Sequence, residues 1–240
     1  MIPAGLRHAA VIMDGNGRWA GARGWQRTRG HKEGITSVRE CVTDAARLGL
    51  EWLTLFALST ENYRTRPRTE IRYLMGLLRR FLVNERPTLM ENRVRLKSSG
   101  RVSELPEKVV AALRASERLT ERNDGMTLCL ALNYGGQAEI VDAARAVAED
   151  CRTGATSPGD IDEERLRSKF YLPEMPDVDL LIRTAGEQRV SNFLLWQIAY
   201  AEIHSSPKCW PDFRKADLEC AFDDFAKRKR KFGGLVTRTV

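Results

Sequence analysis

The chain has 240 residues, 42% of them hydrophobic, which is enough for the core of one large α/β domain, and we expect residues 1–240 to form a single domain. The formal net charge of +7 favours anionic partners such as phosphorylated small molecules or acidic lipids, although much of the excess lies in the run Lys227 to Lys231. Five cysteines without a C-x-x-C pair exclude a disulfide framework, and no apolar run approaches the roughly 20 residues of a membrane span, so we expect a cytoplasmic protein without a signal peptide.

Apolar runs and helical patterns alternate along the chain. Strands are predicted at five apolar runs, residues 9–13, 52–58, 94–97, 126–132 and 178–182. Helices are predicted between and after them, at residues 35–45, 71–81, 106–113, 140–147 and 162–170, from near Ser191, and at 218–225. Such alternation predicts an α/β fold with a central, mostly parallel sheet flanked by helices.

Residues 13–19, Met-Asp-Gly-Asn-Gly-Arg-Trp, directly follow the first predicted strand. In an open α/β sheet, ligands bind at the carboxyl ends of the strands. Glycine lets backbone N–H groups approach an anion, Arg18 suits phosphate, and Asp14 can hold a hard cation such as Mg²⁺. The loop therefore indicates a site for a metal-bound phosphate, and the alternative is a polar turn with one surface arginine.

Two further polar segments follow later strands. Ser59 to Asn62 comes after the second strand, and Arg183 to Ser191 comes after the strand that ends at Ile182. In a parallel sheet these loops share one edge with the first loop. Two arginines, a glycine and a serine at a predicted helix start suit a diphosphate, whereas the alternative is an ordinary loop with a capping serine.

Three other features have two interpretations each. Arg27 and His31 flank the start of the first long helix, where they bind phosphate or cap the helix. Glu202 follows an apolar run and completes an oxygen-ligand metal site with Asp14 only if the fold unites them. The second long helix carries an apolar stripe of Leu74, Met75, Leu77 and Leu78. Such a stripe ordinarily packs in the core, and it lines a tunnel if the substrate is hydrophobic.

Two phosphate-related motifs are absent from the sequence. There is no G-x-x-x-x-G-K-[ST], which disfavours a Walker-type nucleotide site. There is no D-D-x-x-D either, since the pair Asp223-Asp224 lacks a third acid, and this disfavours a metal cluster caged by carboxylates.

The chain resembles the cis-prenyltransferases, and most closely the undecaprenyl diphosphate synthases. The matching segments run in the family order and cover nearly the whole chain: residues 8–31, 56–75, 133–136, 182–213 and 232–234. The most specific of them are residues 13–19 and residues 191–197, Ser-Asn-Phe-Leu-Leu-Trp-Gln. The resemblance implies a homodimer with the fold of that family, in which a hydrophobic tunnel accompanies the parallel sheet.

The resemblance also implies an activity, the Mg²⁺-dependent addition of isopentenyl diphosphate to an allylic diphosphate (dimethylallyl, geranyl or farnesyl), with new double bonds in the Z geometry. We expect a long polyprenyl diphosphate, the precursor of a cell-wall glycosyl carrier. The alternatives on the same fold are a short-chain or irregularly coupling synthase and a non-catalytic partner subunit. We expect no nucleic-acid partner and at most a peripheral contact with the inner membrane face.

The family pattern implies roles for individual residues. Asp14 is the catalytic carboxylate and binds Mg²⁺ with Glu202, and Asn62 stands at the proton-acceptor position. The allylic diphosphate is expected to contact the first loop and the start of the long helix, at Gly15, Asn16, Gly17, Arg18, Trp19, Arg27 and His31. Further substrate contacts are expected at Ser59, Thr60, Glu61, Tyr63 and Arg66, and isopentenyl diphosphate is expected at Arg183, Arg189, Val190 and Ser191.

The sequence departs from the family pattern mainly on the side of the second substrate. Tyr63 replaces a tryptophan and one extra residue precedes Pro67, so either Arg64 or Arg66 is the anion-binding arginine of that loop. We favour Arg66 because it directly precedes the proline. There are three other departures: Ala185 stands in place of a glycine, Arg101 in place of an aspartate, and Lys231 in place of an arginine. Product length, preferred primer, mode of coupling and the role of the basic tail stay open.

Overall fold

The computed structural model describes residues 2–228, and within them six strands form one sheet in which every pair is parallel. Their order is β3-β4-β2-β1-β5-β6. The strands are β1 (His8–Ile12), β2 (Trp52–Ser59), β3 (Arg95–Ser99), β4 (Thr127–Tyr134), β5 (Leu180–Arg183) and β6 (Glu202–Ser205). The expected α/β class with a central parallel sheet is confirmed.

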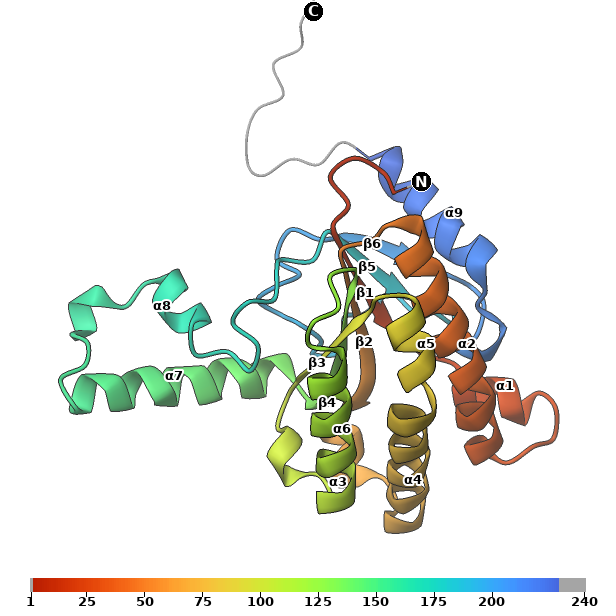
Figure 1. Cartoon of the computed structure of the whole chain (residues 1–240), viewed down its shortest axis with the longest axis horizontal. Helices are drawn as coiled ribbons and strands as arrows, with labels where there is room; N and C mark the ends of the chain where they lie inside the picture. The colour runs from red at the N-terminus through yellow and green to blue at the C-terminus, as the bar shows by residue number, and fades with distance from the viewer. Residues whose placement is uncertain (1, 229–240) are drawn as a thin grey trace, which may run out of the picture.

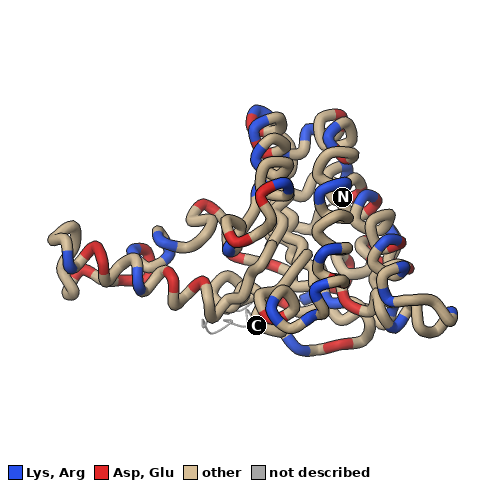
Figure 2. Tube along the Cα trace, turned by 90° about the horizontal axis from the view of Figure 1, so that it is seen from below, with Lys and Arg blue, Asp and Glu red and all other residues tan. Residues whose placement is uncertain are grey.

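One face of the sheet is covered by a layer of helices (Figure 1). These are α2 (Arg27–Leu48), α4 (Arg68–Asn84), α5 (Arg86–Glu91), α6 (Glu107–Thr120) and α9 (Lys215–Ala226). The short helices α1 (Asn16–Gly21) and α3 (Thr60–Thr65) lie next to strand ends. Helix α7 (Gly136–Arg152) runs outward and carries α8 (Glu163–Arg167) on an arm along which both basic and acidic residues occur (Figures 1 and 2).

Alternate residues of β1, β2, β4 and β5 enter two separate clusters of buried side chains. In β1, Ala9 and Val11 pack under the helical layer, while Ala10 and Ile12 face the other side. That second side is covered by irregular chain, including Phe193 and Met175, rather than by helices. Because both faces are covered, β1 and β4 are buried along their whole length, and this explains why the sequence is largely apolar there.

The polar segment after β2 forms a short helix where the sequence suggested a loop. Ser59 is the N-cap of α3, and its hydroxyl accepts a hydrogen bond from the N–H of Asn62 at 3.1 Å. The helix ends at Thr65 because Arg66 precedes Pro67 and takes an extended conformation, with ψ of 151°. This helix projects its side chains over the carboxyl edge of the sheet.

The helix predicted from near Ser191 is wrong. Ser191, Asn192 and Leu194 have φ of 48°, 60° and 46°, in the left-handed region, so the segment is a series of turns. The following strand β6 was not predicted, because it has only four residues, Glu202–Ser205, and none of them is buried.

None of the helices within residues 2–228 combines the length and the apolar character that crossing a bilayer requires. Part of the basic run, Lys229 to Lys231, and the matching segment 232–234 lie outside the described residues, and so does the departure at Lys231.

Candidate active site

A cavity of about 330 Å³ opens at the carboxyl edge of the sheet, between the ends of β1, β2 and β5 and helices α2 and α4. One end of it is polar and is lined by Asp14, Gly15, Asn16, Gly17, Arg27, His31, Ser59, Asn62, Arg66, Arg183 and Ser191. The remainder is apolar and includes Leu74, Met75, Leu77 and Leu78 from α4, with Val38, Leu55, Phe81 and Leu132. The fold therefore brings three distant polar segments together above one apolar space.

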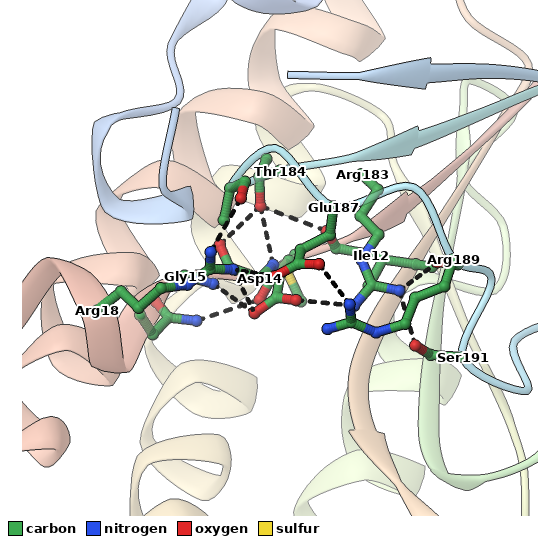
Figure 3. Close-up of polar contacts among 12 residues, drawn as sticks. Ile12, Asp14, Gly15, Arg18, Arg183, Thr184, Glu187, Arg189 and Ser191 are labelled. Carbon is green, nitrogen blue, oxygen red and sulfur yellow. Dashed lines mark hydrogen bonds and ion pairs between the residues drawn. The ribbon is translucent and has the colours of Figure 1, made fainter. Parts of the chain in front are cut away.

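Asp14 and Arg183 form the centre of the polar end (Figure 3). The Arg183 guanidinium donates to Asp14 Oδ2 at 2.8 Å, to the Ser191 hydroxyl at 2.7 Å and to the backbone carbonyl of Arg189. Its Nε is buried and has no hydrogen-bond partner among the described residues. Buried donors are normally paired, so this N–H is suited to an oxygen of a bound anion.

Thr184 fixes the backbone of Asp14 from the neighbouring strand end. Its fully buried hydroxyl accepts from the N–H of Asp14 at 2.8 Å and donates to the carbonyl of Asp14 at 2.7 Å. The same carbonyl accepts from the N–H of Trp210 at 2.9 Å. The position of Asp14 is thus set by two other segments of the chain.

Asp14 is ionised in this environment. Partial burial raises its pKa, but the hydrogen bonds from Arg183 and from the N–H of Gly15, with the charge of Arg18, outweigh that effect and hold the pKa below its usual value. A carboxylate that stays ionised is available to a cation across the neutral pH range.

Close backbone packing shapes the loop after Asp14. Gly15 has φ of 96°, and a Cβ there would lie 2.8 Å from both Ala185 Cβ and Cys209 Sγ, so a side chain has no room. In the next residue, Asn16, Oδ1 is buried without a hydrogen-bond partner among the described residues. Because Asn16 lines the cavity, this oxygen is suited to accept a hydrogen bond from a ligand or from a bridging water.

His31 and Arg66 meet at the entrance between α2 and α3. Arg66 donates to His31 Nε2 at 3.3 Å and to Glu70 Oε1 at 2.8 Å. Burial, and then the charge of Arg66, lower the pKa of His31 to about 4 despite Glu70, so the ring is a neutral acceptor at pH 7. Arg66 lines the cavity, whereas Arg64 is exposed and does not, which agrees with the preference for Arg66.

Asn192 connects three loops around the site. Its side chain donates to Glu61 Oε1 at 2.7 Å and accepts from the N–H of Gln137 at 2.8 Å. Its carbonyl accepts from the N–H of Gly136 at 2.7 Å. The start of α7, helix α3 and the loop that carries Ser191 are thereby held together, and this explains the left-handed conformation of Asn192.

Some predicted substrate contacts lie outside the cavity. Arg18 and Arg189 both pair with Glu187, Arg18 at 3.0 Å, at the rim beside Asp14 (Figure 3). Trp19 points outward, where Nε1 donates to Asp212. The other predicted contacts that do not line the cavity are Thr60, Glu61, Tyr63 and Val190. The Thr60 hydroxyl is buried against the Asn133 carbonyl, so its role is structural.

The expectation that Glu202 shares a metal ion with Asp14 is wrong within one chain. Glu202 begins β6 and is in register with Leu180, which is itself in register with Ala9. It therefore lies at the amino edge of the sheet, separated from Asp14 by about 16 Å along the strand direction alone, at roughly 3.3 Å per residue, and by the width of β5 between the two strands. Its carboxylate pairs with Arg228 at 2.9 Å. Nothing in the sequence around Glu202 distinguishes the two edges, because β6 was not predicted.

The donor set around Asp14 fits a hard cation that is held mainly by substrate. No group of three or more His, Cys, Asp or Glu residues in the described part of the chain could enclose a metal ion. Mg²⁺ is bound in many proteins by one or two carboxylates together with substrate phosphates and water. Ionised Asp14, next to donors for phosphate, supplies the protein part of such a site.

Sequence reasoning did not single out Thr184, Glu187 and Asn192. Each lies within a segment that was recognised, but its role depends on contacts with backbone or with side chains from other loops. Spacing along one strand or helix carries no signal for such contacts. Only the register of β1 against β5 places Thr184 beside Asp14.

A family sequence profile described as "Putative undecaprenyl diphosphate synthase" matches residues 12–233. An isoprenyl transferase of Rhodopirellula baltica is 45% identical over 229 residues, which cover 95% of this chain and 93% of that protein. A ditrans,polycis-undecaprenyl-diphosphate synthase ((2E,6E)-farnesyl-diphosphate specific) of Salmonella typhimurium is 48% identical over 234 residues, 97% of this chain and 92% of that protein.

Two solved structures share the fold. Lavandulyl diphosphate synthase from Lavandula x intermedia, in complex with dimethylallyl diphosphate, superposes with a TM-score of 0.92 at 37% identity, covering 95% of this chain and 98% of that one. A "probable undecaprenyl diphosphate synthase" from Campylobacter jejuni gives a TM-score of 0.79 at 34% identity, covering 95% and 99%.

Proposed function

This chain belongs to the undecaprenyl diphosphate synthase family of cis-prenyltransferases, and we propose that it condenses isopentenyl diphosphate with an allylic prenyl diphosphate to give a Z-configured polyprenyl diphosphate. The observation that carries the proposal is a single cavity with anion-binding groups at one end and apolar walls at the other. A prenyl diphosphate has the same division into a charged head and an apolar chain.

In the proposed reaction the allylic carbon–oxygen bond breaks and the electron pair leaves with the diphosphate. Arg27 and the backbone N–H groups of the loop after Asp14 face the growing negative charge, which they stabilise without reorganising. The π electrons of isopentenyl diphosphate then form the new carbon–carbon bond. The adjacent carbon then loses a proton to the released diphosphate, and Asn62, which lines the same cavity beside Ser59, is proposed to orient this transfer.

Arg183 and Ser191 are proposed to hold the diphosphate of the second substrate. Arg183 is almost fully buried and keeps an unpaired Nε, so it offers a fixed, charged donor rather than a mobile surface charge. Its contact with Asp14 links the second substrate to the catalytic carboxylate. Once they release Glu187 at the rim, Arg189 is proposed to join this diphosphate and Arg18 to join the allylic diphosphate.

We propose Mg²⁺ as the cation, held by Asp14 and substrate oxygens, where it supplies Lewis-acid assistance to the leaving diphosphate. Asp14 is ionised and positioned by Thr184 and Trp210 before any ligand arrives. The chain therefore contributes one oriented carboxylate.

The apolar part of the cavity is proposed to receive the growing chain. Leu74, Met75, Leu77 and Leu78 line it from α4, and such walls exclude water from the reactive allylic carbon. The space between these side chains and the sheet is proposed to limit product length.

We further propose that residues 1–240 form one catalytic domain, that the product is the precursor of a cell-wall glycosyl carrier, and that two copies assemble into a homodimer. Within residues 2–228, β6 is an edge strand of the sheet, and the exposed side chains of Tyr200 and Ile203 lie just before it and on it. Both features support the dimer, because a strand edge beside apolar surface favours pairing. Light scattering on the purified chain tests it.

The activity is tested by incubating the enzyme with labelled isopentenyl diphosphate, Mg²⁺ and dimethylallyl, geranyl or farnesyl diphosphate, and sizing the products by mass spectrometry. A ladder of Z-prenyl products that disappears with EDTA supports the proposal. No incorporation with any primer contradicts it.

A second candidate is a short-chain or irregularly coupling synthase. It is favoured by the TM-score of 0.92 with lavandulyl diphosphate synthase and by the altered loop that contains Tyr63. Product size separates a short-chain synthase from the main proposal. An assay with dimethylallyl diphosphate as the only substrate identifies irregular coupling, because only irregular coupling joins two allylic units.

A further inference from the structure

A second concave surface lies outside the cavity, between α3, the outer face of α4 and the start of α6. It is an open groove of about 560 Å³. We call it the basic groove, since six of its twelve lining residues are cationic and none is acidic: Arg64, Arg66, Arg68, Arg72, Arg79 and Lys108. Arg66 and Met75 also line the substrate cavity, and the other lining residues have no part in the reaction described above.

The positive charge of the basic groove is largely uncompensated. Arg66 pairs with Glu70, but the other five cations form no salt bridge with any residue in the range 2–228. Arg68, Arg72 and Arg79 recur at intervals of four and seven residues, so they lie along one exposed stripe of α4. The nearest acidic residue on α6 is Glu107, which does not line the groove.

The floor of the basic groove is apolar. It is built from Tyr63, Ile71, Met75, Gly76, Pro106 and Val109. Apolar side chains between arginines favour an amphiphile with a charged head over a purely ionic partner. A single-stranded nucleic acid would also need a row of aromatic side chains for base stacking, and Tyr63 is the one aromatic residue in the lining.

The basic groove and the substrate cavity share a wall. Arg66 and Met75 line both, so α4 has the cavity on one side and the groove on the other. If the groove binds a surface, only the thickness of α4 separates that surface from the apolar cavity.

We propose that the basic groove docks the enzyme on a bilayer surface that contains anionic phospholipid. The inference goes beyond the proposed reaction and does not depend on it, since binding to vesicles needs no substrate. The arginines of α4 contact phosphate headgroups, and the apolar floor contacts the boundary with the acyl chains.

The test is co-sedimentation of the full chain with phosphatidylcholine vesicles with and without phosphatidylglycerol. The variant R68Q/R72Q/R79Q removes three groove charges. A matched control, R47Q/R118Q/R122Q, removes three exposed arginines that also form no salt bridge with described residues. Circular dichroism and thermal melting are used to check that both variants fold.

The wild type is expected to bind only the vesicles with phosphatidylglycerol, and less at high salt. The groove variant should lose roughly a hundredfold in affinity, because each basic residue at an anionic surface contributes about a fivefold factor. The control should change by a few-fold at most.

Three results would overturn the proposal: no vesicle binding by the wild type, equal losses in the groove variant and the control, or loss only when Lys229, Arg230 and Lys231 are neutralised. Arginine-dependent binding of RNA without binding of vesicles would overturn it as well. Prenyl transfer is assayed separately, in detergent and without vesicles. Failure of the reaction can therefore be distinguished from failure of docking.

Discussion

The hydroxyl of Thr184 forms hydrogen bonds with both backbone polar groups of Asp14, at 2.8 Å to the N–H and 2.7 Å to the carbonyl oxygen. Two neighbouring parallel strands are thereby joined just beyond their carboxyl ends. The orientation of the catalytic carboxylate proposed here follows from that junction rather than from the loop sequence alone.

Thr184→Val keeps the shape of the side chain and removes both hydrogen bonds. We expect kcat to fall roughly tenfold to a hundredfold, since small misplacements of a catalytic group have effects of that size. The unpaired N–H of Asp14 should also cost about 1–3 kcal/mol of stability. Thr184→Ser restores the hydroxyl and should recover most of kcat, whereas equal activity of both variants would contradict a positioning role. Steady-state kinetics and thermal melts provide the measurements.

Asp14→Ala should lower turnover by at least 10²–10³-fold, the usual effect of removing one group that stabilises developing charge. The fold should survive because Asp14 is only half-buried and contributes no apolar packing. Asp14→Asn is the control, because an amide still accepts from the N–H of Gly15 but no longer offers a charge. Single-turnover rates at several Mg²⁺ concentrations check both variants; near-normal turnover of Asp14→Ala would remove Asp14 from its proposed role.

Arg66→Gln should raise the KM for a diphosphate substrate by roughly tenfold to a hundredfold, because a charge-assisted contact contributes about 1.5–3 kcal/mol. Arg64→Gln is the matched control, two residues earlier and exposed, and should leave KM within about twofold of wild type. If the two variants exchange these effects, Arg64 is the anion-binding residue of the loop.

Leu77→Trp should shorten the product, since Leu77 lines the apolar part of the cavity and a larger side chain there takes space from the growing chain. Val83→Trp adds the same side chain to an exposed position on the same helix and should leave the product distribution unchanged. Mass spectrometry of extracted products decides. An unchanged distribution for folded Leu77→Trp would assign that residue to the core alone.

His8 makes stability depend on pH. It is fully buried, with its ring nitrogens on the Pro176 carbonyl and the Thr54 hydroxyl, and burial lowers its pKa from 6.5 to about 4. The unfolded chain binds the proton more readily, so this contribution to stability is complete above pH 6.5 and is lost as the pH falls toward 4. The contribution is about 3 kcal/mol at most.

Urea unfolding at pH 7 and pH 5 measures this slope. His31 titrates in the same range and direction, so the His8→Gln variant must be compared with His31→Gln. Each variant should lose part of the pH dependence, and a slope unchanged in His8→Gln would show that His8 is not the titrating group.

The apolar runs predicted most of the sheet, because strands buried on both faces have few polar residues. Five of the six strands were recognised in this way, and the polar segments after three of them meet in one cavity, as the parallel arrangement required. Cys41 and Cys129 are buried, in agreement with their apolar surroundings.

The remaining features depend on contacts between distant segments. Phe193 and its neighbours look helical in sequence, yet the positive φ of Asn192 serves the contacts with Gly136 and Glu61. Glu202 was expected beside Asp14 at the carboxyl edge of the sheet, whereas it lies at the amino edge. Its strand, β6, is too short and too exposed to show a strand-like apolar pattern in the sequence. Sequence reasoning identifies which residues carry chemistry more readily than it identifies which residues hold them in place.

Helix α4 is a partition one helix thick, and Met75 on this helix and Arg66 just before it line both compartments. A substitution at Met75 that adjusts the size of the inner compartment also reshapes the outer surface. Selection for a new product and selection for attachment therefore meet at this residue.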